Sequence, residues 1–124
     1  MAILHHALPD GSSHHDLLLA PAIEVADEAR TVPTWRCSGD PLSLPPGHAV
    51  GIERIAPHRG LYLRLREPRE LGGDRGRVTP VHAGWHRCAG ALLWMSRLDG
   101  DAIAFHMDER SLRRAELPVQ VNAS

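Results

Sequence analysis

The sequence predicts an all-β fold: a small β-barrel, closed or partly open, built of short antiparallel strands with at most one or two short helices. Ten Pro and 11 Gly are spread over the 124 residues, so few stretches could hold a helix longer than about ten residues. Short apolar segments alternate with turn-forming residues at even spacing, which is typical of barrels and sandwiches. Aromatic residues make up only 4% of the chain, so the core is expected to be mainly aliphatic.

Three extended segments are expected in the first part of the chain, over residues 3–5, 14–19 and 32–37. The second of these is largely apolar on both faces, as in a buried strand. Residues 9–13, Pro-Asp-Gly-Ser-Ser, have the composition of a turn, and residues 42–47 form a Pro-rich loop. Residues 23–29 fit either a helical turn or a strand with a polar edge.

The clearest alternation of apolar and polar side chains covers residues 61–66. Three Leu would share one face of a strand there, with Tyr62, Arg64 and Arg66 on the other. This pattern predicts a half-exposed strand.

Three more strands are expected in the second half of the chain, over residues 77–81, 91–98 and 102–107. Residues 72–76 are a Gly-rich connection that leads into the first of them. Asp99-Gly100-Asp101 separates the other two, and Asp-Gly between two apolar runs predicts a β-hairpin. Residues 108–116 are the one plausible helix.

The chain is long enough for one domain, expected to span residues 1–124 with a core over 3–107 and a C-terminal tail over 108–124. All 14 basic residues are Arg, and 15 acidic residues bring the formal net charge to -1, which argues against binding along a polyanion. However, residues 54–77 hold seven Arg against three acidic residues, whereas residues 1–53 hold two against seven. This distribution argues against a long electrostatic contact along a duplex and predicts weak, salt-sensitive binding.

Several classes of protein are excluded. The chain has no apolar run of about 18 residues, and His5, His6 and Pro9 interrupt the N-terminus, so neither a membrane span nor a signal peptide is expected. The sequence therefore predicts a cytoplasmic protein with no membrane partner. Cys37 and Cys88 form neither a disulfide framework nor a zinc-type pair, and both are expected to be plain thiols.

Residues 5–16, His-His-Ala-Leu-Pro-Asp-Gly-Ser-Ser-His-His-Asp, are the most informative segment. On a strand, His14 and Asp16 would project from the same face about 7 Å apart and could hold one ion between them. Either His5 or His6, returned across the turn by the preceding strand, could supply a third ligand. Two imidazoles and a carboxylate suit Mn, Fe or Zn. A solvated His-rich turn is the competing interpretation.

His58 and Tyr62, four residues apart, form a second group of polar residues. Beside several arginines, this His and Tyr could bind and protonate a phosphate, because Arg offers a planar fork of donors to its oxygens. The candidate phosphate or nucleic-acid contacts are Arg59, Arg64 and Arg66. The competing interpretation is a solvated Arg face with Tyr62 packed at its edge.

In their order along the chain, these motifs resemble the 3'-phosphoesterase domain of bacterial DNA ligase D. That family has a strand with His, then His-aromatic-Asp, a Ser-Trp dipeptide, a His-Pro-Leu-x-Tyr element and a Gly-rich turn before a Val strand. The similar elements in this chain are His5, residues 14–16, residues 34–35, residues 58–62 and residues 73–78. The resemblance covers roughly residues 3–107.

The resemblance implies a small β-barrel that removes a 3'-phosphate or a 3'-terminal ribonucleotide from a nucleic-acid end in DNA repair. It implies a Mn²⁺ ion, with Zn²⁺ or another transition metal as alternatives, held by His5, His14 and Asp16. His58 and Tyr62 would contact the scissile phosphate, with His58 supplying charge or a proton. The implied partners are nucleic-acid 3' ends and a DNA ligase or another repair protein.

Two Arg of the family pattern are not matched. The family usually has Arg two residues after the Asp, where this chain has Leu18. A second family Arg would fall near Val50; Arg54 is the basic candidate there, and it would share a face with His58 only if the strand runs unbroken. The turn before residues 14–16 is also longer than in the family, which keeps His6 as an alternative ligand.

Three other functions stay open. Leu18 in place of Arg favours a catalytically weakened barrel that binds nucleic-acid ends or a repair partner. His14 and Asp16 with a distal residue such as His86 are similar to the facial triad of non-haem iron oxygenases, although the chain is short for that fold. The third is a structural domain with an incidental His-rich turn.

Overall fold

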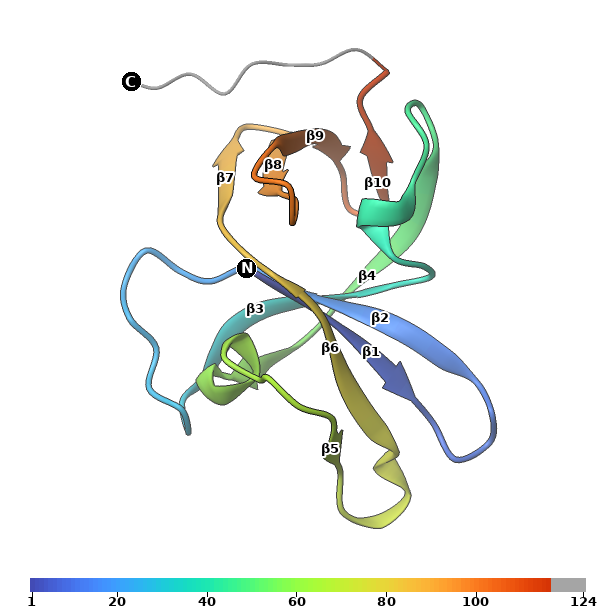
Figure 1. Ribbon diagram of the computed structural model, residues 1–124, viewed down its shortest axis with the longest axis vertical. Helices are drawn as coiled ribbons and strands as arrows, with labels where there is room; N and C mark the ends of the chain where they lie inside the picture. Colours follow the sequence, from blue (N-terminus) through green and yellow to red (C-terminus); the bar gives the residue numbers. More distant parts are fainter. Residues whose placement is uncertain (117–124) are drawn as a thin grey trace.

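The computed structural model describes residues 1–116, which form an all-β fold, as predicted (Figure 1). The strands are β1 (Ala2–Ala7), β2 (Ser13–Leu18), β3 (Arg30–Cys37), β4 (Ala49–Arg59), β5 (Arg69–Glu70), β6 (Arg77–Ala83), β7 (His86–Ala89), β8 (Leu92–Ser96), β9 (Ala102–Met107) and β10 (Ser111–Arg114). The helical elements of the described residues are three 3-10 turns, η1 (Pro41–Ser43), η2 (Gly60–Leu63) and η3 (Gly73–Arg75). None of these turns is long or apolar enough to cross a membrane. Residues 117–124, the end of the expected tail, lie outside the described residues.

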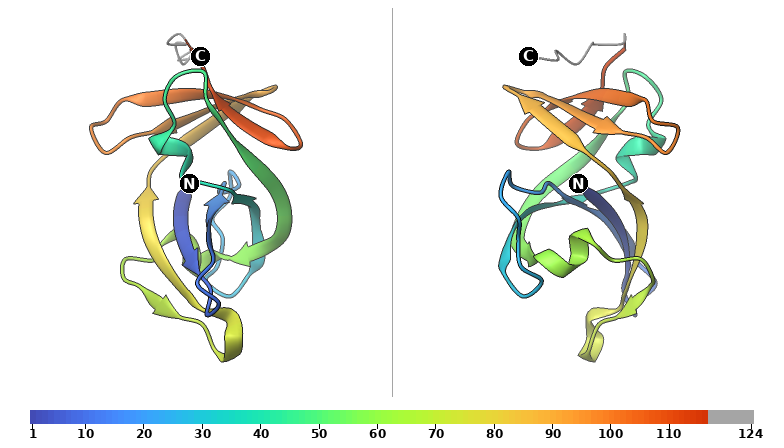
Figure 2. Two further views of the ribbon diagram at one scale, coloured as in Figure 1. Left: turned by 90° about the vertical axis from the view of Figure 1, so that its right-hand side faces the viewer. Right: turned by 60° about the vertical axis from the view of Figure 1, so that its left-hand side comes forward.

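The ten strands form one antiparallel sheet in the order β5-β6-β1-β2-β3-β4-β10-β9-β8-β7. Over the described residues this sheet is open, with β5 and β7 at its two edges. β7, β8, β9 and β10 lie at one end of the molecule, and β1, β2, β5 and β6 lie toward the other (Figure 1). The long, curved β4 pairs with both β3 and β10 and so connects the two ends (Figure 2).

Adjacent residues of the β1–β2 hairpin contribute to two separate cores, because side chains alternate between the faces of a strand. The first core consists of Met1, Ile3, Leu17, Leu19, Cys37, Leu44, Ile52, Leu93, Met95, Ile103, Phe105 and Leu112. The second core consists of Ala2, Leu4, Leu18, Val25 and Val32. The second core covers the same hairpin face that carries His6, His14 and Asp16.

Most of the predicted strands are confirmed, with small shifts at their ends. The predicted segments 3–5, 14–19, 32–37, 77–81, 91–98 and 102–107 correspond to β1, β2, β3, β6, β8 and β9. The Asp-Gly hairpin is also present: Gly100 has φ of +89°, and its N–H donates to the Arg97 carbonyl. Residues 23–29 form turns and bends, so neither of the two structures considered for them occurs.

The strand predicted over residues 61–66 is wrong. β4 ends at Arg59, opposite Arg30, which is the first residue of β3, so the ladder between β3 and β4 cannot continue. Gly60 then turns the chain into η2, in such close contact with the Ala26 carbonyl that a Cβ would not fit. The alternation in this segment therefore does not reflect strand pairing.

The helix predicted over residues 108–116 is also wrong, because this segment contains β10. The Asp108 carboxylate accepts hydrogen bonds from the backbone N–H groups of Arg110 and Ser111, which stabilises a tight turn back toward β9. Leu112 on β10 is completely buried in the first core. The core therefore extends into the segment expected to be a tail.

Candidate functional site: a His–Asp group beside an arginine-lined cavity

The register of the β1–β2 hairpin decides which histidines meet. His6 lies opposite His14, and His5 lies opposite His15. Since neighbouring residues of a strand point to opposite faces, the first pair shares a face with Asp16 and the second pair does not. The hairpin turn over residues 8–12, closed by a Leu8 N–H to Ser12 carbonyl bond, sets this register.

His6, His14 and Asp16 form one compact group. His14 Nε2 lies 3.2 Å from His6 Nδ1 and 3.2 Å from Asp16 Oδ1, and His6 Nδ1 lies 3.9 Å from Asp16 Oδ2. One ligand atom from each residue lies within 4.8 Å of the others, so the group could hold a metal ion. His5 is on the opposite face and packs against His15, which corrects the expected ligand set: His6 takes the place assigned to His5.

Backbone carbonyls orient two imidazoles toward Asp16. His6 Nε2 lies 2.5 Å from the Arg75 carbonyl, and His58 Nδ1 lies 3.2 Å from the Ala56 carbonyl. A carbonyl only accepts hydrogen bonds, so these two nitrogens carry the protons, and the lone pairs of the neutral rings are at His6 Nδ1 and His58 Nε2. These lone-pair atoms lie 3.9 Å and 3.5 Å from Asp16 Oδ2. Atoms that carry only lone pairs do not hydrogen-bond to one another, so a proton or a metal ion between them would stabilise this arrangement.

The Asp16 carboxylate has the surroundings expected of a cation ligand. It is 1% exposed, and its Oδ1 has no hydrogen-bond partner among the described residues. An ionised carboxylate is costly to bury without a compensating charge. Burial, partly offset by Asp16, lowers the pKa of His14 and so favours the neutral form that a metal ligand needs. Two imidazoles and a carboxylate therefore fit a transition-metal ion here, in an enclosed position.

A cavity of about 200 Å³ lies beside this group. Its polar lining consists of His6, Arg30, His58, Arg59, Tyr62 and Arg75. The remaining lining residues are apolar, so among the described residues the lining includes three arginines and neither Asp nor Glu. Such a cavity suits an anion that approaches the His–Asp group.

His58 and Tyr62 meet as the sequence predicted, although not on a strand. Their ring centroids lie 5.7 Å apart, because η2 folds Tyr62 back toward the end of β4. Arg59 holds Tyr62 from the other side: its Nη2 donates to the Tyr62 hydroxyl at 3.5 Å, and its Nη1 donates to Glu28 at 3.0 Å. The bond to Tyr62 and that to Glu28 raise the pKa of Arg59.

Arg54 does not belong to this site, which corrects its expected catalytic role. The register between β3 and β4 shifts just before His58, where a β-bulge puts one extra residue into β4. The bulge reverses the alternation of side chains between Ile55 and His58, so Arg54 faces away from His58. Its guanidinium lies instead over the Trp35 ring, 4.6 Å from the ring centroid.

Arg64 and Arg66 do not line the cavity beside His58 either. Both border a separate cavity of about 520 Å³, and Arg64 Nη2 donates to Asp27 at 2.6 Å and to the Val25 carbonyl at 2.7 Å. η2 replaces the strand that would have aligned these side chains with Tyr62. Of the three arginines predicted to contact phosphate, Arg59 alone borders the cavity beside His58.

The sequence reasoning missed Arg30 and Arg75. Arg30 lies at the beginning of β3, outside any motif, and no pattern in the sequence singles it out. Arg75 lies in η3, in the Gly-rich connection that was predicted only as a turn. Leu18, at the family's Arg position, is completely buried in the second core, so it contributes no polar group to the cavity.

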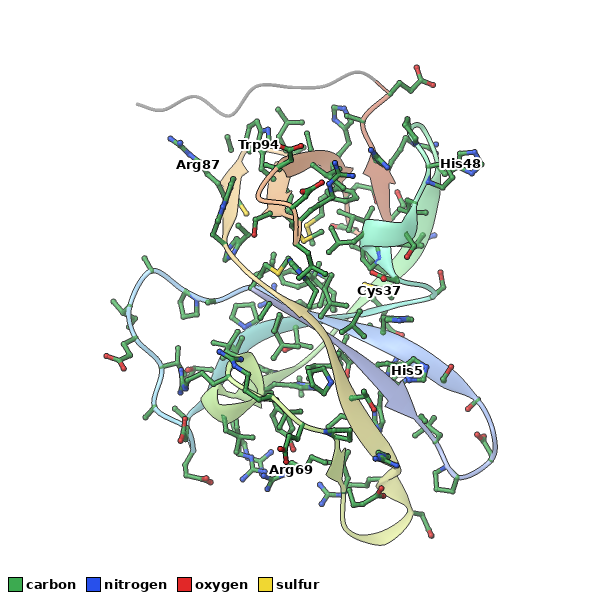
Figure 3. The ribbon with its side chains drawn as sticks, in the orientation of Figure 1. His5, Cys37, His48, Arg69, Arg87 and Trp94 are labelled. Carbon is green, nitrogen blue, oxygen red and sulfur yellow. The ribbon has the colours of Figure 1, made fainter. Side chains whose placement is uncertain are left out.

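Neither cysteine takes part in the site. Cys37 is buried in the first core, and burial, followed by the charges of Asp16 and Asp40, raises the pKa of its thiol to about 12. Cys88 is exposed on β7. Figure 3 shows Cys37 near the middle of the molecule and His5 on the β1–β2 hairpin, whereas Arg87 and Trp94 lie at the end formed by β7 and β8.

No protein-family model matches the chain, and no significant match occurs among curated proteins or solved structures. A proposal for the function therefore depends on the geometry of the site and on the motifs of the sequence.

Proposed function

We propose that this protein is a metal-dependent phosphoesterase that acts on nucleic-acid 3' ends in DNA repair, removing a 3'-phosphate or a 3'-terminal ribonucleotide. One observation carries the proposal: the His6–His14–Asp16 group, with His58 Nε2 3.5 Å from Asp16, adjoins a cavity with three arginines and Tyr62. Metal-suited ligands beside a cationic cavity are what hydrolysis of a phosphate ester requires. The order of motifs along the chain supports the choice of a 3' end.

In this proposal, His6, His14 and Asp16 hold the ion. The resemblance of the motifs favours Mn²⁺, and two imidazoles with a carboxylate also suit Zn²⁺ or another transition metal. When bound, such an ion acts as a Lewis acid toward a phosphoryl oxygen. The Arg75 carbonyl keeps His6 in the tautomer that directs Nδ1 toward the ion, and such outer partners commonly matter for affinity.

His58 and Tyr62 act on the phosphate from the cavity side. The bond to the Ala56 carbonyl places His58 Nε2 where a proton can pass between this nitrogen and an oxygen in the cavity. Arg59 holds the Tyr62 hydroxyl in place. The natural partners are then nucleic-acid 3' ends and a DNA ligase or another repair protein, which agrees with the cytoplasmic location expected from the sequence.

The test is an assay on primer–template DNA with either a 3'-phosphate or a 3'-terminal ribonucleotide, in Mn²⁺ and in chelator. We expect Mn²⁺-dependent release of phosphate or nucleoside, abolished by His14→Ala. The matched control is His15→Ala, which removes the neighbouring imidazole on the other face of the same strand. Absence of any product from folded wild-type protein across Mn²⁺, Zn²⁺ and other transition metals contradicts the proposal.

A second candidate function, a binding module for nucleic-acid ends or a repair partner, is favoured by one observation. Leu18 is completely buried where the family pattern has Arg. Removing one donor from a transition-state site commonly costs about 10²–10³ in rate. Tight binding of a 3'-phosphorylated end without turnover would favour this candidate over the esterase.

A further inference from the structure

The three arginines that border the cavity differ in their partners. Arg59 is occupied, since it bonds to Glu28 and Tyr62 and lies over the Tyr62 ring at 5.6 Å from its centroid. Arg30 and Arg75 have no carboxylate partner among the described residues. An arginine that lines a cavity and has no carboxylate partner is available to an anion, to which its guanidinium can offer paired donors.

Arg30 and Arg75 reach the cavity from separate parts of the chain. Arg30 is the first residue of β3 and lies opposite Arg59 in the ladder with β4. Arg75 is anchored from both sides: its Nε donates to the Gly72 carbonyl at 2.9 Å, and its own carbonyl accepts from His6. This arrangement leaves both terminal nitrogens of Arg75 without a carboxylate. The residue whose carbonyl orients His6 is thus also a lining residue of the cavity.

We propose that Arg30 and Arg75 bind a terminal phosphomonoester. This inference rests on the proposed function and makes the 3'-phosphate end, and not a phosphodiester, the substrate class of the protein. A phosphomonoester carries a charge of about -1.5 to -2 near pH 7, whereas a diester carries one negative charge. Two guanidinium groups free of carboxylates match the larger charge. Arg59 is a positioning residue for Tyr62, because its own charge is already paired with Glu28.

The cavity also limits the size of what can enter. Its volume is about 200 Å³, enough for a phosphoryl group with part of the terminal sugar. His6 and His58 line this space and lie next to the buried Asp16, so the His–Asp group adjoins the cavity through these two rings. A chain end can deliver its phosphate there, whereas an internal diester would have to accommodate nucleotides on both sides.

The test measures binding in chelator, where no hydrolysis occurs. Three labelled oligodeoxynucleotides of one sequence, ending in 3'-phosphate, 3'-methylphosphate or 3'-hydroxyl, are titrated by fluorescence anisotropy. We expect the 3'-phosphate end to bind about tenfold more tightly than the other two, since charge-assisted bonds distinguish it. Arg30→Gln and Arg75→Gln should each remove most of this preference. Arg110→Gln, at an exposed position away from the cavity, changes the net charge equally and should leave the preference intact.

Arg59→Gln separates positioning from binding. This variant should retain most of the binding preference, yet lower Mn²⁺-dependent turnover, because the Tyr62 hydroxyl is no longer held in place.

Two results overturn the inference. One is equal affinity for the monoester and the methyl diester. The other is a preference that survives in the Arg30→Gln/Arg75→Gln double variant with native circular dichroism. If the preference and its arginine dependence are found without turnover by any metal, the inference stands and the esterase proposal fails. If turnover proceeds with unchanged KM in both single variants, the esterase proposal stands and the inference fails.

Discussion

The two faces of the β1–β2 hairpin carry histidine pairs of similar geometry but different surroundings. The His6 and His14 ring centroids lie 4.8 Å apart with an interplanar angle of 72°, and those of His5 and His15 lie 5.1 Å apart at 62°. The first pair adjoins the buried Asp16 carboxylate. The second pair joins no group of three potential ligands among the described residues. Two facing imidazoles therefore do not by themselves make a candidate metal site.

What differs is the support that each face receives from the rest of the fold. On the His6 face, the Arg75 carbonyl orients His6 and the bulged end of β4 brings His58 to Asp16. On the other face, His15 lies opposite Cys37, whose side chain is buried in the first core. One face thus ends in a polar cavity, and the other continues into apolar packing. Four predictions test this difference.

The largest expected effect comes from Asp16→Asn, which removes the charge with little change in shape. Mn²⁺ affinity, measured by isothermal titration calorimetry, should fall about a hundredfold or more, because the remaining ligands are neutral and even outer partners of a metal are commonly worth about 10–100-fold. The matched control is Asp40→Asn on the His15 side, which should bind Mn²⁺ like the wild type. Equal losses in the two variants would place the ion outside the His–Asp group.

A smaller effect is expected from removing one histidine from each face. His6→Ala should lower Mn²⁺ affinity about tenfold to a hundredfold by removing an imidazole ligand. His5→Ala, its sequence neighbour, should change the affinity by less than about twofold, because its ring packs against His15. The opposite order of effects would restore the ligand set expected from the family resemblance.

Gly76→Ala should weaken the support of the His6 face. Gly76 has φ of +84°, and a Cβ there would collide with the Ala7 carbonyl at the end of β1. Backbone strain of this kind costs on the order of 1–3 kcal/mol, so thermal unfolding should show a clear loss of stability. Metal affinity should fall several-fold as the Arg75 carbonyl moves away from His6.

Gly11→Ala is the control for that strain. Gly11 has φ of +89° in the hairpin turn, but a Cβ would meet nothing within 4 Å. It should cost roughly 1 kcal/mol of stability, because a residue with a Cβ disfavours the left-handed conformation, and it should leave Mn²⁺ affinity unchanged. A Gly76 variant no worse than the Gly11 variant would refute the role assigned to this contact.

The smallest effect concerns pH and involves both faces. Burial lowers the pKa of His14 and of His15 below the ordinary value of 6.5. The unfolded chain then binds more protons than the folded protein once the pH falls below about 6.5, so stability is complete above that pH and declines beneath it. In chelator, the melting temperature should drop by a few degrees between pH 7.5 and pH 5.

Variants assign this pH effect to each face. His14→Gln and His15→Gln should each remove part of the decline, and the double variant should remove more. If the melting temperature of the wild type rises on acidification, the pKa of the two rings is higher in the folded protein than in the unfolded chain. That result would contradict the effect expected from their burial.

Local patterns predicted the parts of the protein that depend on neighbouring residues. The high Pro and Gly content excluded long helices, and period-2 alternation put His14 and Asp16 on one face. The four-residue spacing of His58 and Tyr62 also led to a real contact, although η2 and not a strand produces it. Alternation failed over residues 61–66, because no strand remains opposite that segment.

The sequence by itself determined the all-β class and the residue types that meet at the site, because turn chemistry and side-chain alternation are local properties. Tertiary structure decided which of two adjacent histidines joins Asp16, since a shift of one residue in register reverses the face of every side chain in a strand. It also decided that a bulge turns Arg54 away from His58. Arg30 and Arg75 meet at one cavity only because β3 and η3 are brought together by pairing across the sheet, and no local pattern encodes that pairing.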